Sequence, residues 1–118
     1  MNKRSLGKQK ENEVCDLIIK NGYKVIEQNY RNRYGEIDII AENNDYIIFI
    51  EVKYRRNDKF GTGEESIDIK KCRKILMGSQ QYITDKNITK GVRYDAAVLS
   101  TNEIRYIENY FWGDEIGF

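Results

Sequence analysis

Residues 35–55 carry the sequence GEIDIIAENNDYIIFIEVKYR, in which two apolar stretches flank a short polar segment. The β-branched and aromatic residues of 36–42 and 46–55 predict two strands. The polar tip Asn43-Asn44-Asp45 between them is typical of a hairpin turn. We therefore expect an antiparallel hairpin here, and its register decides which side chains meet.

Pairing across this hairpin brings acidic side chains together. With the turn centred between Asn44 and Asp45, Asp38 lies opposite Glu51, and Lys53 projects from the same face because side chains alternate along a strand. Two carboxylates at this spacing repel each other, and a divalent cation bound by both would offset the repulsion. The pattern predicts a metal site. An exposed hairpin whose polar residues only keep it soluble explains the same residues.

The same register sets Glu36 opposite Lys53. We expect these two side chains to form an ion pair, so Glu36 is a weaker candidate for a metal ligand than Asp38 or Glu51.

A helix is predicted over about 5–20, with Asn21-Gly22 as its stop signal. Its apolar stripe includes Val14 and Ile18, and Glu11 lies on that stripe, whereas Glu13 points away from it. A carboxylate on a packing face is costly unless it finds a partner. Glu11 is therefore a candidate third ligand, and the alternative is that it lies just outside the buried part and is solvated.

The remaining pattern predicts one domain over residues 1–118. Expected are a short strand over Tyr23–Asn29, a turn over Arg31–Gly35, a charged loop over Arg56–Glu65, a second helix over about 66–84, and a second hairpin made of 92–99 and 104–110. The order α-β-β-β-α-β-β predicts an α/β fold in which helices pack on a mixed sheet. Cys15 and Cys72 fall beside apolar residues of the two helices and are expected to be buried, reduced thiols.

The chain of 118 residues holds 20 Lys and Arg against 19 Asp and Glu, so any polyanion partner would be bound by a local basic cluster. It has no histidine, which excludes a His base, a Ser-His triad and a His-ligated metal. Oxygen ligands alone favour Mg²⁺, with Mn²⁺ as a substitute. No signal sequence or membrane span is visible, so we expect a cytoplasmic protein.

Carboxylates, Mg²⁺ and a neighbouring lysine suit phosphodiester hydrolysis. Lys53 would orient or deprotonate the attacking water, or neutralise charge that develops on the phosphate.

Four segments are similar to those of a known family: Gly35–Ile40, Phe49–Arg55, Phe60-Gly61 and Arg93-Tyr94-Asp95. Together they resemble the bacterial YraN-like family of uncharacterised proteins, and the similarity extends from Gly7 to about Phe111. Asp38 followed by Glu51-Val52-Lys53 resembles the core motif of the PD-(D/E)XK nuclease superfamily, which includes Holliday-junction-resolvase-like and restriction-endonuclease-like folds.

This resemblance implies a restriction-endonuclease-like mixed sheet flanked by helices. It implies metal binding by Asp38, Glu51 and Glu11, with Lys53 as the catalytic lysine, and it assigns the family's second-helix lysine to Lys71 or its neighbour Lys70. Two departures stand out. Val14 follows Lys10-Glu11 where the family usually has Gly-Glu and then Ala, and Ser79 replaces a usual Ala.

We therefore expect an Mg²⁺-dependent endonuclease that hydrolyses DNA phosphodiester bonds, with branched or structured DNA as a candidate substrate. The residues expected to contact the DNA backbone are Arg55, Arg56, Lys59 and Lys71. One alternative is a non-catalytic DNA-binding or repair-accessory module that retains the nuclease fold.

A second alternative is an interaction domain that uses the aromatic segment Tyr106, Tyr110, Phe111 and Trp112, although packing within the domain is the commoner use of such a segment. The same aromatic residues are also candidates for a homodimer interface. Gln80 and Gln81 are weak candidates for a site role.

Overall fold

The computed structural model describes residues 3–54, 68–100 and 103–111 of the chain. Its elements are, in order, α1 Lys3–Lys20, β1 Lys24–Asn32, β2 Gly35–Glu42, β3 Tyr46–Tyr54, α2 Ile69–Asp85, β4 Gly91–Leu99 and β5 Ile104–Ile107. The predicted α/β class and the predicted order of elements are both confirmed.

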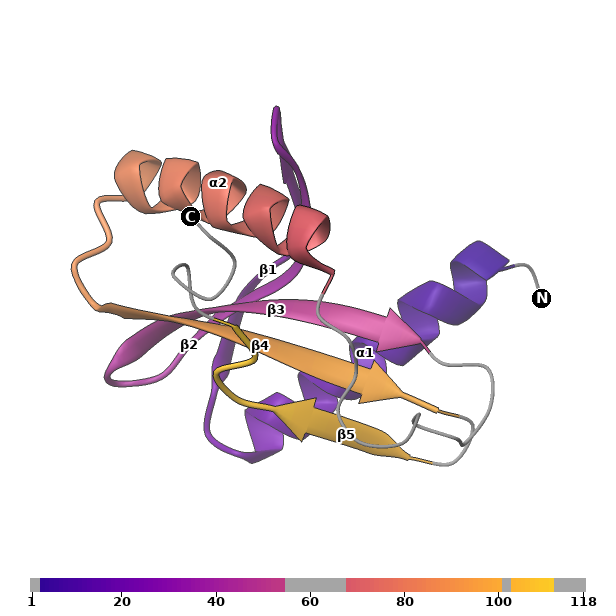
Figure 1. The fold of residues 1–118 in the computed structure, drawn as a ribbon. Coiled ribbons are helices and arrows are strands. Elements are labelled where there is room, and N and C mark those ends of the chain that lie inside the picture. Colours follow the sequence, from indigo (N-terminus) through magenta and orange to yellow (C-terminus); the bar gives the residue numbers. More distant parts are fainter. Residues whose placement is uncertain (1–2, 55–67, 101–102, 112–118) are drawn as a thin grey trace.

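The strands form one mixed sheet in the order β1-β2-β3-β4-β5 (Figure 1). Neighbouring strands are antiparallel except β3 and β4, which run parallel. A parallel pair needs a long crossover connection, and α2 lies in that connection. The carboxyl ends of β3 and β4 therefore meet at one end of the sheet, on the right in Figure 1.

The two helices cover opposite faces of the sheet, because each strand sends alternate side chains to each face. Phe49 packs with residues of α2 such as Cys72 and Tyr82, whereas Ile39 and Ile50 pack with Val14 and Ile18 of α1. Cys15 belongs to the α1 side and Cys72 to the α2 side, and both are buried free thiols as predicted.

The β2–β3 hairpin has the predicted register. Its pairs run from Glu42–Ile47 to Ile39–Ile50. The turn is closed by Asn43, whose Oδ1 accepts hydrogen bonds from the backbone N–H groups of Asp45, at 2.9 Å, and Tyr46, at 2.8 Å. An asparagine that bonds its own turn in this way is a recurrent turn device, so the polar tip fixes the register.

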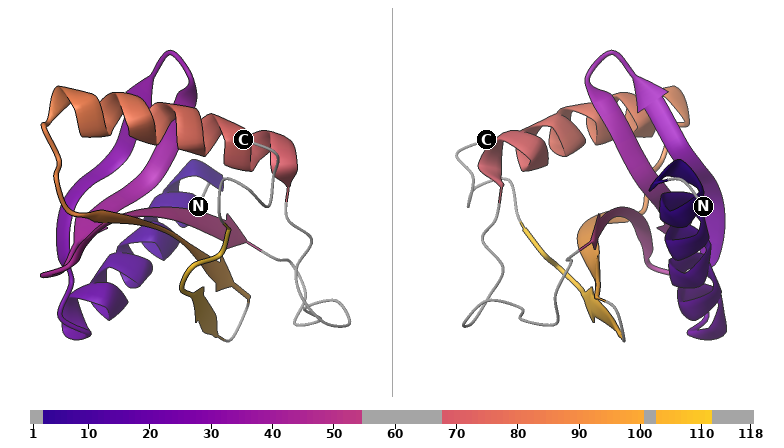
Figure 2. Two further views of the ribbon diagram at one scale, coloured as in Figure 1. Left: turned by 60° about the vertical axis from the view of Figure 1, so that its left-hand side comes forward. Right: turned by 90° about the vertical axis from the view of Figure 1, so that its right-hand side faces the viewer.

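The hairpin of β1 and β2 differs from the predicted strand and turn, because β1 continues to Asn32 instead of ending at Asn29. Arg31 pairs with Glu36 and Asn32 with Gly35, so the predicted turn over 31–35 shrinks to residues 33–34. In Figure 2 this hairpin extends past α2. Asn32 donates from Nδ2 to the carbonyl oxygen of Gly78 at 3.1 Å, and a Cβ at Gly78 would lie 3.4 Å from Asn32 Oδ1, so this glycine lets the hairpin approach the helix closely.

Two element ends also differ from the prediction. α2 begins at Ile69, after Asp68, whose carboxylate accepts a hydrogen bond from the N–H of Lys71 at 3.1 Å and so caps the helix. β5 ends at Ile107 instead of Tyr110, and Asn109 adopts a φ of 55°, which turns the chain out of the strand. The charged loop predicted over 56–65 lies outside the described residues.

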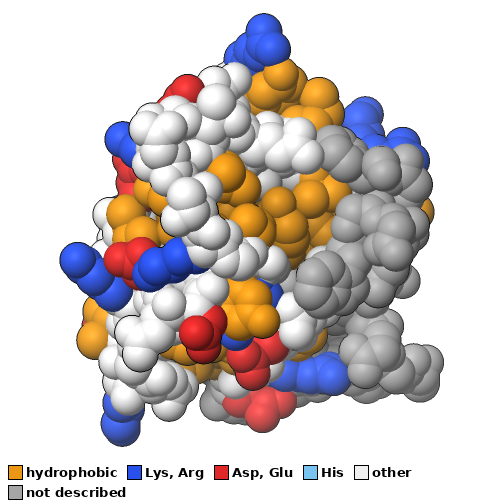
Figure 3. Space-filling view, turned by 90° about the vertical axis from the view of Figure 1, so that its left-hand side faces the viewer, with side chains coloured by type: hydrophobic (Ala, Val, Ile, Leu, Met, Phe, Trp, Pro, Cys, Tyr) orange, Lys and Arg blue, Asp and Glu red, His pale blue; other side chains and the backbone are white. Residues whose placement is uncertain are grey.

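No helix in the described ranges is long and apolar enough to cross a membrane. The face at the start of β3 exposes hydrophobic side chains among charged groups of both signs, without a continuous area of one charge (Figure 3). The acidic residues singled out in the sequence lie toward the other end of β3.

Candidate functional site

Asp38 lies where the pairing between β2 and β3 ends. The last backbone pair is Ile39–Ile50, and beyond it the side chain of Asp38 takes over, because its Oδ2 accepts a hydrogen bond from the N–H of Val52 at 2.8 Å. This bond fixes the carboxylate against β3, between Glu51 and Lys53 in the chain. Burial raises the pKa of Asp38 from 3.8 to about 6 and outweighs the opposing effects of the Val52 N–H and the Lys71 ammonium.

Glu51 is only 4% exposed. Its Oε1 lies 3.0 Å from Lys71 Nζ and 4.0 Å from Lys53 Nζ. Its Oε2 is also buried but has no hydrogen-bond partner among the described residues. Leaving a buried acceptor unpaired costs about 1–3 kcal/mol, and more for a charged group. One oxygen of this carboxylate is therefore free for a ligand.

Lys53 is 8% exposed, and its Nζ donates to Tyr110 Oη at 2.8 Å. The predicted ion pair between Glu36 and Lys53 is wrong. Glu36 instead accepts a hydrogen bond from Arg31 Nε at 2.9 Å, because β1 is long enough to bring Arg31 opposite Glu36.

Glu11 faces inward as predicted, with 9% of its surface exposed, whereas Glu13 is exposed and pairs with Lys10 at 3.4 Å. Burial raises the pKa of Glu11. A long hydrogen bond of 3.4 Å from Gln28 Nε2 reaches its Oε1. The Glu11 charge in turn contributes to the raised pKa of Asp38, so the two carboxylates affect each other electrostatically.

Within the described ranges, no three side chains of Asp, Glu, Cys or His come close enough to hold one metal ion together. Asp38 and Glu51 flank the same strand end and both act on the ammonium of Lys71. The charge of Glu11 affects the pKa of Asp38, but Glu11 does not form a group of three carboxylates with Asp38 and Glu51 that could hold one ion.

A groove of about 480 Å³ opens beside Asp38, between the start of β2 and the first turns of α2. It is lined by Gly35, Glu36, Asp38, Asp68, Lys70, Lys71, Lys74 and Ile75. The three lysines and Asp68 thus line the helix side, and Glu36 and Asp38 line the strand side. The volume is in the range of small-ligand sites, and the lysines suit a phosphate group that approaches Asp38.

Lys71 is the one predicted nucleic-acid contact that lies in the described ranges, and its side chain is half exposed. Burial alone would lower its pKa, but the Glu51 carboxylate, with help from Asp38 and Asp68, raises it instead. Arg55, Arg56 and Lys59 lie outside the described residues. On the same helix Gln80 is exposed, and Gln81 donates to Asp85 at 2.9 Å.

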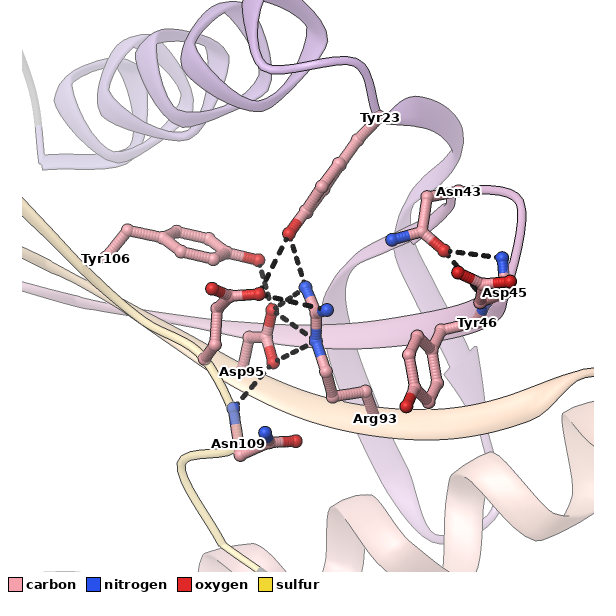
Figure 4. Close-up of polar contacts among 9 residues, drawn as sticks. Tyr23, Asn43, Asp45, Tyr46, Arg93, Asp95, Tyr106 and Asn109 are labelled. Atoms are coloured by element: carbon pink, nitrogen blue, oxygen red, sulfur yellow. Dashed lines mark hydrogen bonds and ion pairs between the residues drawn. The ribbon is translucent and has the colours of Figure 1, made fainter.

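A second buried charge cluster is centred on Asp95, which belongs to a segment of the family resemblance but had no role assigned to it from the sequence (Figure 4). Asp95 is 0% exposed and bonds Arg93 through both Nε, at 3.0 Å, and Nη2, at 2.9 Å. It also accepts from Tyr106 Oη at 2.6 Å and from the Asn109 N–H at 3.0 Å. Arg93 further donates to Tyr23 Oη and lies 3.0 Å from Glu108.

Both oxygens of Asp95 are used, so this cluster, which we call the Asp95 cluster, is structural. The available sequence signal was the alternation of Arg93 and Asp95 with apolar residues in a strand that is otherwise apolar.

Tyr106, Tyr110 and Phe111 pack within the domain, as the commoner use of such a segment predicts. Tyr110 and Phe111 are buried in the core on the α2 side, and Tyr106 packs on the α1 side. Trp112 lies outside the described residues.

The sequence of this chain is similar to those of known proteins. The model of the uncharacterised protein family UPF0102 matches residues 10–99. The chain therefore belongs to this family, which confirms the YraN-like resemblance.

Individual relatives agree. A UPF0102 protein of Fusobacterium nucleatum subsp. nucleatum is 45% identical and aligns over the whole of both chains. Another, of Sulfurihydrogenibium sp., is 45% identical over 94% of this chain and 97% of its own. A third, of Lachnoclostridium phytofermentans, is 41% identical over 94% of this chain and 96% of its own.

Proposed function

We propose that this protein is a divalent-metal-dependent endonuclease of the PD-(D/E)XK type, with a restriction-endonuclease-like sheet, that hydrolyses phosphodiester bonds of DNA. The observation that carries the proposal is the buried Oε2 of Glu51, which has no hydrogen-bond partner in the part of the chain that the structure describes. A buried carboxylate oxygen without a partner, next to a carboxyl group whose pKa is raised to about 6, favours a cation as the missing neighbour.

The donor set suits Mg²⁺ or Mn²⁺, because only oxygen ligands are at hand. Asp38 and Glu51 would bind the ion directly. Glu11 would act through water, since no three acidic side chains of the described ranges can reach one ion together and Mg²⁺ usually keeps several waters. When bound, Mg²⁺ supplies Lewis-acid polarisation of a phosphate oxygen and stabilises charge on the leaving oxygen.

The chain's own groups would do the rest. Lys53 Nζ, 4.0 Å from Glu51 Oε1, carries a positive charge beside the site and is positioned to orient the attacking water or to neutralise charge on the phosphate. The Val52 N–H holds the carboxylate of Asp38, a residue of β2, in a fixed place against β3.

The groove beside Asp38 would hold the DNA backbone. Lys70, Lys71 and Lys74 line it, and lysine–phosphate contacts give affinity without sequence preference. We propose that this contact is extended by basic residues shortly after β3 in the sequence: Arg55, Arg56 and Lys59.

The direct test is incubation of the purified protein with plasmid, linear duplex and four-way-junction DNA, each with Mg²⁺ or Mn²⁺. Lys53→Met, which keeps an unbranched apolar stem in the buried position, should lower the cleavage rate by about 10²–10³-fold, the loss typical of removing one charge-stabilising group. Asp38→Asn and Glu51→Gln should abolish the metal-dependent cleavage.

Lys90→Met is the matched control, because Lys90 also pairs with a glutamate, Glu42, at 2.9 Å but lies near the far end of β2. It should cleave at the wild-type rate. Equal rates for wild type and Lys53→Met on every substrate would contradict the proposal.

One observation favours a non-catalytic DNA-binding module instead: Lys71 lies 3.0 Å from Glu51 Oε1 and neutralises part of the acidic site without a metal. Binding to junction DNA that is indifferent to both Mg²⁺ and Asp38→Asn, without cleavage of any substrate, would support this alternative.

A further inference from the structure

Lys53 is held by a residue far away in the chain. Its Nζ lies 2.8 Å from Tyr110 Oη and 4.9 Å from the centre of the Tyr110 ring. The distance to Glu51 Oε1 is 4.0 Å, longer than a direct hydrogen bond. Lys71, at 3.0 Å, already occupies that carboxylate oxygen. The position of the Lys53 ammonium is therefore set by the tyrosine and not by the neighbouring glutamate.

The Asp95 cluster fixes the segment that carries Tyr110. Asn109, with a φ of 55°, donates its N–H to Asp95 Oδ1 at 3.0 Å. The next residue, Tyr110, donates its N–H to the Tyr94 carbonyl oxygen at 2.7 Å. Two consecutive N–H groups, bonded to the Asp95 carboxylate and to the Tyr94 carbonyl oxygen, thus bring the chain from the end of β5 back across β4 to the α2 side of the sheet, where Lys53 lies.

Aromatic packing also supports this segment but does not explain the hydroxyl. Phe111 stacks on Tyr94 with ring centres 4.9 Å apart and meets Tyr110 edge-on at 6.1 Å. A phenylalanine at position 110 would pack equally well, whereas a buried hydroxyl costs free energy unless it is bonded. The Tyr110 hydroxyl is bonded to Lys53, so its presence points to the lysine.

We propose that Tyr110 is a positioning residue that holds the Lys53 ammonium beside Glu51, and that the bond between Asp95 and Asn109 keeps Tyr110 in place. The catalytic part of this inference rests on the proposed nuclease function, whereas the part about the position of Lys53 does not.

The test compares Tyr110→Phe with Tyr94→Phe. Tyr94 belongs to the same aromatic stack and also loses a buried hydroxyl bond in this change, the one to Ser79 Oγ at 2.7 Å, but its hydroxyl does not touch Lys53. A buried, bonded ammonium exchanges its protons slowly, so ¹⁵N NMR can follow the Nζ signal of Lys53, which is assigned by its absence in Lys53→Met.

Tyr110→Phe should keep the fold, lose the Lys53 ammonium signal, and lower kcat by about 10–100-fold with KM within about twofold, since a displaced catalytic group costs rate more than binding. Tyr94→Phe should keep the signal and a kcat within about threefold of wild type.

Retention of the Lys53 signal in Tyr110→Phe would overturn the inference, as would a wild-type kcat after the signal is lost. If the wild type cleaves no DNA, the proposed function fails, and the NMR comparison still decides whether Tyr110 holds Lys53.

Discussion

Two buried acidic groups lie on opposite faces of the same sheet and differ in how completely they are bonded. Asp95, on the α1 side, accepts hydrogen bonds on both oxygens from Arg93, Tyr106 and Asn109. Glu51, on the α2 side, is about as deeply buried. Lys71 contacts its Oε1, whereas its Oε2 has no partner in the described part of the chain.

The difference separates a structural cluster from a candidate site. A fully bonded buried carboxylate holds elements together. A partly bonded one keeps an unfavourable energy that a ligand can relieve. Asp38, next to Glu51, has a raised pKa for the same reason, because burial is not fully offset by its bonds. Perturbed groups of this kind are common at functional sites.

The largest expected change in stability comes from substitution of Asp95. Asp95→Asn removes the buried counter-charge of Arg93, which keeps only the exposed carboxylate of Glu108, and should lower the free energy of unfolding by about 3–5 kcal/mol. Urea denaturation measures it. Glu51→Gln is the contrasting variant and should change stability by less than about 1 kcal/mol, because Lys53 keeps Tyr110 and the half-exposed Lys71 keeps contact with water. Equal losses in the two variants would remove the distinction.

Asp38 should make stability depend on pH when no metal is present. Its pKa is about 6 in the folded protein against an ordinary 3.8, so the folded state binds the proton more tightly. The contribution of Asp38 to the free energy of unfolding should be fully present below pH 3.8 and should fall by about 2–3 kcal/mol as the pH rises to 6, then level off.

Urea titrations in EDTA at several pH values, compared with Asp38→Asn, isolate this effect. The difference between the two proteins should vary with pH over this window. A constant difference would mean that Asp38 has an ordinary pKa.

A divalent metal ion bound at Glu51 should stabilise the folded protein. At a Mn²⁺ concentration one hundred times Kd, the free energy of unfolding should rise by about 2.7 kcal/mol. Glu51→Gln and Asp38→Asn should lose most of this gain. Glu42→Gln, which removes a carboxylate that pairs with Lys90 near the other end of β2, should keep it. A gain that is unchanged in Glu51→Gln would contradict a metal site at Glu51.

The smallest effect should come from an ion pair that is not deeply buried. Lys90→Ala removes a partner of Glu42 at 2.9 Å, but both side chains are partly exposed. Such pairs contribute about 0–1 kcal/mol, so urea denaturation should show a loss within this range. A loss comparable to that of Asp95→Asn would mean that pairing, and not burial, decides the contribution.

The sequence predicted the fold well where local signals are strong. The polar tip at Asn43–Asp45 fixed the hairpin register, and apolar periodicity identified both helices. The extent of β1 was missed because Arg31 and Asn32 are polar, and only their pairing with Glu36 and Gly35 keeps them in the strand.

The orientation of the candidate site residues could be predicted from the sequence, but their bonding partners could not. Helical geometry correctly predicted that Glu11 points inward and Glu13 outward. The partner of Lys53 could not be deduced, because Tyr110 is brought to it by a backbone path anchored on Asp95. Contacts between such distant positions depend on tertiary structure, which single-sequence patterns do not encode.

An anomalous difference map from crystals soaked in Mn²⁺ would show whether Glu51 Oε2, which has no partner among the described residues, belongs to a metal site. We predict a peak within roughly 2–2.5 Å of Glu51 Oε2 and of a carboxylate oxygen of Asp38. Absence of a peak there at saturating Mn²⁺, with Glu51 Oε2 bonded to a protein group instead, would contradict this prediction.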